Sequence, residues 1–432
     1  MTWALPTIAV LLIGYAALSR ALQRANVSGA MFFTITGLVA GSVLGLLDLD
    51  VEGEQVKRLA EITLTLVLFA DASRISLRAL RREFVVPLRL LGIGLPLTIA
   101  AGTLTGALVL SEIGVAEAAV LAIALACTDA ALGEAVVSDE RIPSRVRQGL
   151  NVESGLNDGL CVPLFFIAIA VAEAKSGASS EGAAANLVFE QIGYGLIGGV
   201  LAGAFGALAL RLATRRHLIA PHWRQILPAA SALLAAGVAG ALGGSIFIAA
   251  FTGGVTFGVL RHEGDGDVRE LVDEGGEFFN AITFIVFGAV VLGPLLDELT
   301  WRVGLYAVLS LTVVRMVPVL LAMLGAGARK PTVAFLGWFG PRGVASIVFA
   351  VILVDDTELP HLHDLLLAIT ATIALSVFVH GLTARPLTER YVHWWSSHPR
   401  DALPPMESVP AHEHRPRSPG RVATLGDSSP QR

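Results

Sequence analysis

Apolar stretches long enough to cross a lipid bilayer recur along the whole chain, and they restrict its fold more than any other feature. A transmembrane helix needs about 20 mostly apolar residues. Thirteen such stretches lie at 3–19, 28–47, 58–73, 84–110, 116–137, 146–172, 188–212, 226–241, 243–260, 278–296, 302–324, 332–354 and 364–384. Because they exceed the strands of a membrane β-barrel, they predict an all-α membrane protein. A composition of 54% apolar and 16% charged residues, against roughly a quarter charged in soluble domains, argues against a soluble enzyme.

The loops between these stretches alternate in positive charge. Seventeen lysine and arginine residues fall in the odd-numbered loops, whereas four lie in or beside the even-numbered ones. The positive-inside rule then predicts a multi-pass protein of the cell (plasma) membrane, with its N-terminus outside and its C-terminus in the cytoplasm. The first stretch is not expected to be a signal peptide, because Arg20 and Arg24 follow it rather than precede it. Residues 1–390 are expected to form the membrane domain, and residues 391–432 a disordered cytoplasmic tail.

Ionisable side chains inside the apolar stretches mark the candidate functional residues. They are Asp71, Asp129, Glu134, Glu153, Asp158, Arg315 and Arg342. Placing such a group at bilayer depth costs at least ~2.5–3.5 kcal/mol, so its default interpretation is functional. The alternative is a structural ion pair or a side chain that reaches the interface, and for Asp71, which Arg74 follows closely, the two interpretations stand level. Glu134 is left without a role.

The segment Asn151–Gly159 carries the densest group of polar side chains. On a helix, Glu153 and Asn157 share one face, and Ser154 and Asp158 share the adjacent face. Each of these side chains offers oxygen, which is the ligand that a hard cation such as sodium prefers. No histidine or cysteine ligand accompanies them, which disfavours zinc or copper. The segment therefore predicts an intramembrane site for a monovalent cation.

Two of the apolar stretches contain signals that interrupt a helix. Thr128 and Asp129 form an N-cap signal in the middle of the fifth stretch, so one half-helix is expected to end near Cys127 and another to begin after Asp129. Carbonyls freed there, such as that of Thr128, can face a cation, while Asp129 meets the positive end of the second half-helix. In the twelfth stretch, glycine and proline within 337–343 break the helix, and Arg342 can satisfy negative half-helix ends. Breaks seven stretches apart predict two inverted six-helix repeats, with broken helices 5 and 12, as in secondary transporters.

The same residues resemble a known family. Its motifs match Thr128-Asp129, Glu153-Ser154-Gly155-Leu156-Asn157-Asp158, Arg315 and Gly340-Pro341-Arg342-Gly343, and the resemblance extends over about 1–390. The family is that of the monovalent cation:proton antiporters, specifically the NhaP-like sodium/proton exchangers. The resemblance implies thirteen helices, with a dimerisation domain and a mobile six-helix core, and a role in pH homeostasis. It also implies a homodimer in the bilayer that transports Na⁺ and H⁺, with no cofactor, no enzymatic activity and no nucleic-acid partner.

The resemblance also assigns roles to single residues. The implied cation- and proton-binding set is Asp158, Asp129, Thr128, Ser154 and Glu153, with Asn157, Arg315, Arg342 and Asp71 in supporting positions. Na⁺ would be held by Asp158 as the principal carboxylate, by the Thr128 carbonyl and Ser154, and by Asp129 through water. Glu153 would pair with Arg315, Asn157 would brace the unwound segment, and Asp71 matches an acidic position often found near that arginine. This sequence has Cys127 at the first break, where many members of the family have proline.

Competition for one carboxylate predicts the mechanism. Burial favours the protonated form of Asp158, so protons and sodium ions contend for it, while Arg315 keeps Glu153 ionised. One exchanging carboxylate predicts one-for-one, electroneutral exchange by alternating access. A monovalent cation channel or uniporter is the alternative. An intramembrane aspartyl protease is a remote one, because Asp265 and Asp267 lie in a polar loop rather than in a span. The preference among Na⁺, Li⁺ and K⁺ stays open, since the ligand type is shared.

Overall fold

The computed structural model describes residues 3–47, 54–75, 85–129, 132–177, 181–261, 268, 270–399 and 403–409, and every regular element within these ranges is helical. The elements of the N-terminal part are α1 (Ala4–Arg24), α2 (Gly29–Leu38, continued by a π-helical turn at Val39–Val43), α3 (Glu54–Ser73), α5 (Val85–Arg89, continued by a π-helical turn at Leu90–Gly94) and α6 (Leu95–Val109). The following elements are α7 (Val115–Ala124), α8 (Glu134–Val137), α9 (Ser144–Ser176), α10 (Glu181–Arg215), α11 (Ile226–Ala241) and α12 (Ile246–Leu260). The last are α13 (Glu270–Val286, continued by a π-helical turn at Phe287–Leu292), α14 (Gly293–Leu295), α15 (Trp301–Leu311), α16 (Val313–Ala322), α17 (Lys330–Trp338), α18 (Val344–Asp356), α19 (Leu362–Ser396) and α20 (Pro405–Ser408).

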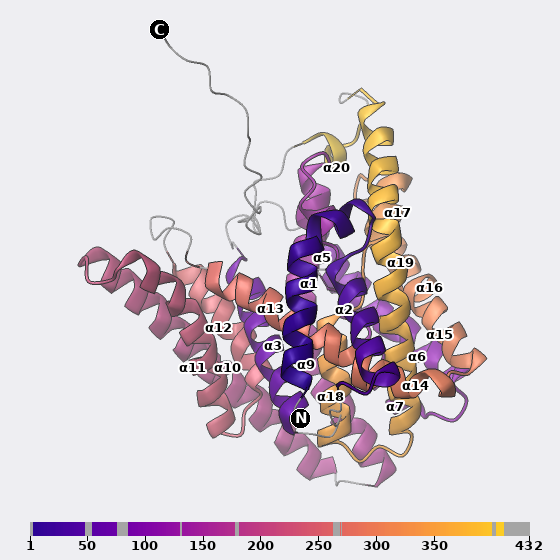
Figure 1. Cartoon of the computed structure of the whole chain (residues 1–432), viewed down its shortest axis with the longest axis horizontal. Helices are drawn as coiled ribbons and strands as arrows, with labels where there is room; N and C mark the ends of the chain where they lie inside the picture. The colour runs from indigo at the N-terminus through magenta and orange to yellow at the C-terminus, as the bar shows by residue number, and fades with distance from the viewer. Residues whose placement is uncertain are drawn as a thin grey trace.

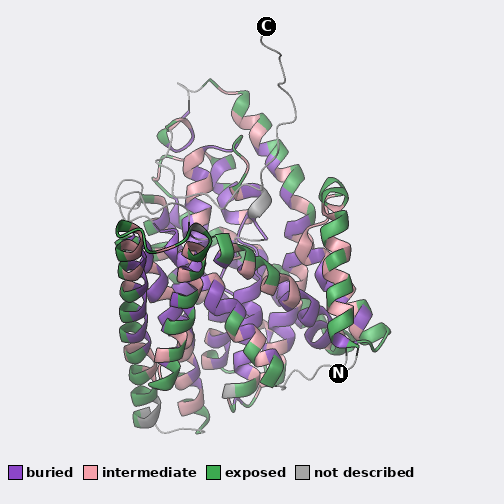
Figure 2. Ribbon diagram, turned by 60° about the vertical axis from the view of Figure 1, so that its left-hand side comes forward, coloured by how far each residue is buried: buried purple, intermediate pink, exposed green. Residues whose placement is uncertain are grey.

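Each of the expected apolar stretches coincides with one helix or with helical pieces separated by an interruption. Among the described residues, seven helices are long and apolar enough to cross a membrane, and four shorter apolar helices accompany them. The outward faces carry large apolar side chains such as Leu108, Phe189 and Phe205, which are 72%, 78% and 65% exposed. Figure 2 shows buried residues in the middle of the molecule and exposed residues along the outer helices. This distribution fits an all-helical protein whose outer surface contacts lipid.

The C-terminal part of the chain differs from the expected tail. Helix α19 continues to Ser396, beyond the boundary expected at residue 390. The short helix α20 then packs its buried side chains Met406 and Glu407 against the protein. The segment 403–409 is therefore a folded part of the molecule, because it buries side chains and satisfies polar groups. The expectation for residues 410–432 lies outside the described residues.

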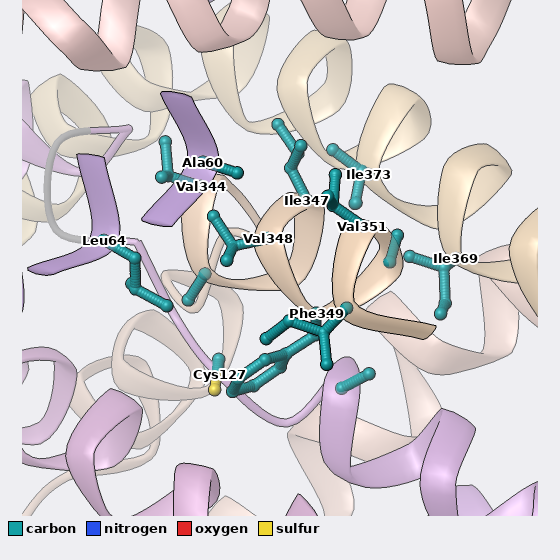
Figure 3. Close-up of a cluster of buried hydrophobic side chains, with 14 of the residues drawn as sticks. Ala60, Leu64, Cys127, Val344, Ile347, Val348, Phe349, Val351, Ile369 and Ile373 are labelled. Atoms are coloured by element: carbon teal, nitrogen blue, oxygen red, sulfur yellow. The ribbon is translucent and has the colours of Figure 1, made fainter. Parts of the chain in front are cut away.

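Helix α9 occupies the centre of the packing. It contacts α3, α7, α10, α12 and α17, while α10, α11 and α12 gather at one side of the molecule and α15, α16 and α19 at the other (Figure 1). The half-helix α18 is held mainly by apolar contacts: Figure 3 shows Val348 and Phe349 of α18 among side chains of α3 and α19. The rings of Phe165 and Phe349 stack with centroids 4.3 Å apart, which fixes α9 against α18. The packing thereby presents both interrupted segments to α9.

Candidate ion-binding site

The two predicted interruptions are present, and they meet each other. Helix α7 ends at Ala124 and α17 ends at Trp338, and the chain is non-helical at Thr128–Asp129 and over 339–343. The Asp129 N–H donates to the Pro341 carbonyl at 2.8 Å. This backbone hydrogen bond joins the two breaks directly, so a shift of one interruption must displace the other.

Asp129 accepts a hydrogen bond from each of the two breaks, and the shorter one caps the half-helix of the opposite break rather than the one expected to follow it. Its Oδ2 accepts from the N–H of Val344, the first residue of α18, at 3.1 Å, whereas its bond to the nearer Leu132 N–H is long at 3.4 Å. Its negative charge thus lies at the positive N-terminus of α18, where the helix dipole stabilises it. Gly343 makes this approach possible, because a Cβ there would overlap the Asp129 carboxylate. The cap comes from the opposite break, across 215 residues of sequence.

Arg342 lies in the position that the sequence predicts, at the negative end of a half-helix. Its side chain is 0% exposed, and Nη1 donates to the carbonyls of Ala126 and Cys127 at 3.2 Å and 3.0 Å. These carbonyls follow the last residue of α7 and have no partner from a continuing helix. A buried guanidinium from the second break therefore holds the unwound carbonyls of the first.

Helix α9 braces the first break from the other side. The Ser154 hydroxyl donates to the Thr128 carbonyl at 2.5 Å, and the Asn157 amide donates to the Ala126 carbonyl at 2.9 Å. The Cys161 thiol donates to the Asn157 side-chain oxygen at 3.1 Å, which orients the amide. The structure thus brings Thr128 and Ser154 together and places Asn157 against the unwound segment, as expected.

Glu153 forms the predicted ion pair with Arg315 of α16. The Arg315 Nη1 and Nη2 atoms donate to the two carboxylate oxygens at 2.5 Å and 2.9 Å. The two side chains are only 5% and 4% exposed. Gly340 leaves room for the guanidinium, since a Cβ at that position would lie 2.5 Å from the Arg315 Nε. The pair binds α9 to α16 and keeps both buried charges compensated.

Asp158 differs from the other acidic residues of the site. It is 7% exposed, and its Oδ1 has no hydrogen-bond partner among the described residues. The side chain lines a cavity of about 180 Å³ whose wall also includes Asp71 and Asp129. A buried carboxylate oxygen without a donor is costly unless a proton or a cation occupies it. The Oδ1 atom of Asp158 therefore differs from the carboxylate oxygens of Glu153, which Arg315 compensates.

Sequence reasoning missed several polar side chains of this cavity. Asp273, Glu277 and Asn280 of α13 line it together with Arg74, which directly follows α3. Asp273 and Glu277 precede the apolar stretch expected at 278–296, so they were assigned to a loop, whereas Asn280 lies near the start of that stretch. Their spacing of four and three residues places them on one helix face, and this spacing is the signal that could have found them.

Asp71 lies beside Arg74. This position agrees with the second interpretation left open for Asp71, that of a structural ion pair. Arg74 Nη1 contacts the Asp71 Oδ1 at 2.7 Å, and Arg74 Nη2 contacts the Asp273 Oδ1 at 2.6 Å. The arginine therefore joins α3 to α13 at the cavity wall. The Gly-Asp-Gly-Asp motif with Asp265 and Asp267 lies outside the described residues.

Comparisons with known proteins agree with these features. The family model "Sodium/hydrogen exchanger, transmembrane" matches residues 8–390. A Na(+)/H(+) antiporter of Schizosaccharomyces pombe is 25% identical over 298 residues, covering 60% of this chain and 62% of that protein. An uncharacterized Na(+)/H(+) exchanger of Mycobacterium bovis is 30% identical over 189 residues, covering 43% of this chain and 32% of that protein.

The fold has a solved counterpart. The sodium proton antiporter MjNhaP1 from Methanocaldococcus jannaschii superposes with a TM-score of 0.72 at 18% identity, covering 90% of this chain and 98% of that one. The curated relatives are longer than the matched region, which spans less than two thirds of the yeast and mycobacterial proteins. The matched family model and the motif residues together show that this multi-pass membrane protein belongs to the sodium/hydrogen exchanger family.

Proposed function

We propose that the protein is a secondary active transporter that exchanges Na⁺, or Li⁺ or K⁺, for H⁺ across the membrane, with Asp158 as the shared cation and proton site. The Asp158 Oδ1, which has no hydrogen-bond partner among the described residues and lies in a cavity shared with Asp71 and Asp129, carries this proposal. Carboxylate, hydroxyl and carbonyl oxygens suit a hard cation. Membership of the exchanger family and the names of the relatives support the same transported ions.

The charge balance of the site supports a one-for-one exchange. Glu153 is compensated by Arg315, and Asp129 accepts backbone N–H bonds at the N-terminus of α18. Both carboxylates are stabilised in their charged forms. Asp158 alone then gives up a proton when it takes up a cation, so the bound site has the same net charge with either substrate. Exchange is electroneutral in this scheme.

Alternating access supplies the transport step of the proposal. The cavity is lined on one side by Asp158 and the start of α18, and on the other by α2, α3 and α13. Rocking of the helices that carry the two breaks against the second group would close this cavity and open the opposite side. The positive-inside rule places the C-terminal end of α3 in the cytoplasm, so the open side is the cytoplasmic one. We include in the proposal the thirteen-helix inverted-repeat topology, the outside N-terminus and the homodimer.

Proteoliposomes that contain a pH-sensitive dye test the proposal. Addition of Na⁺, Li⁺ or K⁺ should dequench the dye with a saturable dependence on cation concentration. Asp158→Asn should abolish the response, because the amide keeps the size of the side chain but cannot exchange a proton. Asp297→Asn, which alters an exposed carboxylate away from the cavity, should respond like the wild type. Retained exchange in Asp158→Asn would disprove the site, and non-saturating cation flux without counter-movement of protons would favour the channel or uniporter.

A further inference from the structure

His380 of α19 is a buried titratable residue that the proposed exchange cycle does not use. It is 2% exposed, and its Nε2 lies 3.0 Å from the carbonyl oxygen of Trp338, the last residue of α17. The two rings also lie side by side, with centroids 5.5 Å apart. The imidazole therefore contacts the C-terminal end of the half-helix that leads into the second break.

The other ring nitrogen reaches the same break through a serine. His380 Nδ1 lies 3.1 Å from the Ser376 hydroxyl, and this hydroxyl oxygen accepts the backbone N–H of Arg342 at 2.7 Å. Nδ1 also lies 3.1 Å from the Ser376 carbonyl oxygen. In the neutral tautomer that carries its proton on Nε2, Nε2–H donates to the Trp338 carbonyl and Nδ1 accepts the Ser376 hydroxyl proton. Both sides of the break are thus bonded to one turn of α19.

The second break needs such partners because it satisfies only part of its own backbone. Pro341 has no N–H to donate, and the carbonyls at the end of α17 have no continuing helix above them. Within the break, the Gly340 N–H bonds the Trp338 carbonyl at 2.9 Å. Helix α19, whose Ile369 and Ile373 lie near α18 (Figure 3), supplies a second donor to the Trp338 carbonyl and an acceptor for the Arg342 N–H.

We infer that His380 and Ser376 form a positioning pair that fixes the second break and, through Arg342, the unwound segment of the first break that leads into Thr128. The Arg342 backbone is held by Ser376, while its guanidinium holds the Ala126 and Cys127 carbonyls. These residues directly precede Thr128. Loss of the pair should therefore loosen the segment that carries the cation ligands without removing a ligand. The expected effect on transport rests on the proposed function.

Two readouts test the inference, and one of them needs no transport. Hydrogen–deuterium exchange of the reconstituted protein should rise several-fold at 339–343 and at 125–129 in Ser376→Ala and in His380→Ala. The matched control is Thr372→Ala, one turn away on the same helix, because this equally buried hydroxyl bonds, within the described part of the chain, to the Ala368 carbonyl of its own helix alone. Its exchange at both breaks should match the wild type.

Transport kinetics provide the second readout. The two variants should raise the apparent KM for Na⁺ about tenfold, at the lower end of the effect of removing an outer-shell partner, with a much smaller change in the maximal rate. His380→Gln keeps a donor toward Trp338 and should restore much of the Na⁺ affinity. The double variant should be no worse than the worse single one, because both residues act in one chain of bonds.

Ser376→Ala removes a single hydroxyl, so it carries the test if His380→Ala does not fold. Unchanged deuterium uptake at either break in Ser376→Ala would overturn the inference, as would an unchanged KM for Na⁺ in an active variant. If the wild-type protein shows no exchange, the proposed function fails, but the deuterium uptake still decides whether α19 positions both breaks.

Discussion

The buried pair of Glu153 and Arg315 offers a quantitative test of how the site is held together. Both side chains are at most 5% exposed, and two hydrogen bonds of 2.5 Å and 2.9 Å join them. Removing one partner leaves the other charge buried without compensation, which costs about 3–5 kcal/mol. We therefore expect Glu153→Ala and Arg315→Ala each to lower the free energy of unfolding by about this amount.

The double variant should be more stable than either single variant, because it leaves no uncompensated charge. It still loses packing, so it should remain below the wild type. The free energy of unfolding can be measured by titrating the protein in mixed micelles with a denaturing detergent, and the double-mutant cycle gives the coupling energy.

Glu54 and Arg58 of α3 provide a matched control at the surface. Their ion pair is 2.6 Å long, but the side chains are 75% and 68% exposed. Solvent screens such a pair, so its coupling energy should be far smaller than that of the buried pair. A double variant Glu153→Ala/Arg315→Ala that is no more stable than the worse single variant would refute the interpretation of these residues as mutually compensating.

Three further outcomes are expected. Gly343→Ala should destabilise the protein by about 1–3 kcal/mol and impair exchange, because a Cβ would overlap the Asp129 carboxylate. The control Gly237→Ala has open space around its Cβ position and should leave exchange unchanged. Equal activity of the two variants would contradict the close approach of Gly343 to Asp129. Glu407→Ala should lower the free energy of unfolding by about 1–3 kcal/mol and the melting temperature with it, because the Glu407 Oε1 accepts hydrogen bonds from the Arg329 N–H and the Thr332 hydroxyl at 2.8 Å and 2.7 Å. An unchanged melting temperature would show that this contact contributes nothing to stability. Sodium-driven proton movement should be insensitive to valinomycin with balanced K⁺, and a sodium-driven current on a solid-supported membrane would rule out the one-for-one scheme.

Local sequence patterns were sufficient to predict the helical architecture and most of the site. The apolar stretches predicted where helices lie, since lipid-exposed backbone must satisfy its own hydrogen bonds. The four-residue spacing in Glu153–Asp158 predicted a polar helix face, and Thr128, Asp129 and Gly340–Gly343 predicted two interruptions, which α7, α17 and α18 show. The π-helical turns had no comparable signal, because they do not change the apolar composition of a span.

The partners of the charged residues could be predicted less well. Asp71 contacts Arg74, three residues away in sequence, but no local pattern indicated that Arg74 also contacts Asp273 of α13. Asp273 and Glu277 were missed because hydropathy assigned them to a loop, although α13 begins at Glu270 and carries both into the cavity. A hydropathy profile reports where a span is apolar, but not how far its helix continues beyond the apolar part.

The sequence by itself determined that the chain is a helical membrane protein with two broken segments and an oxygen-rich polar helix, because these properties follow from composition and from spacing within a helix. Only the tertiary structure decided that Asp129 caps α18 and that Arg342 holds the carbonyls after α7. These bonds join segments about two hundred residues apart, so they depend on how the two breaks meet. Their contact is set by close approach at Gly340 and Gly343 and by the packing of α18, which no local pattern encodes.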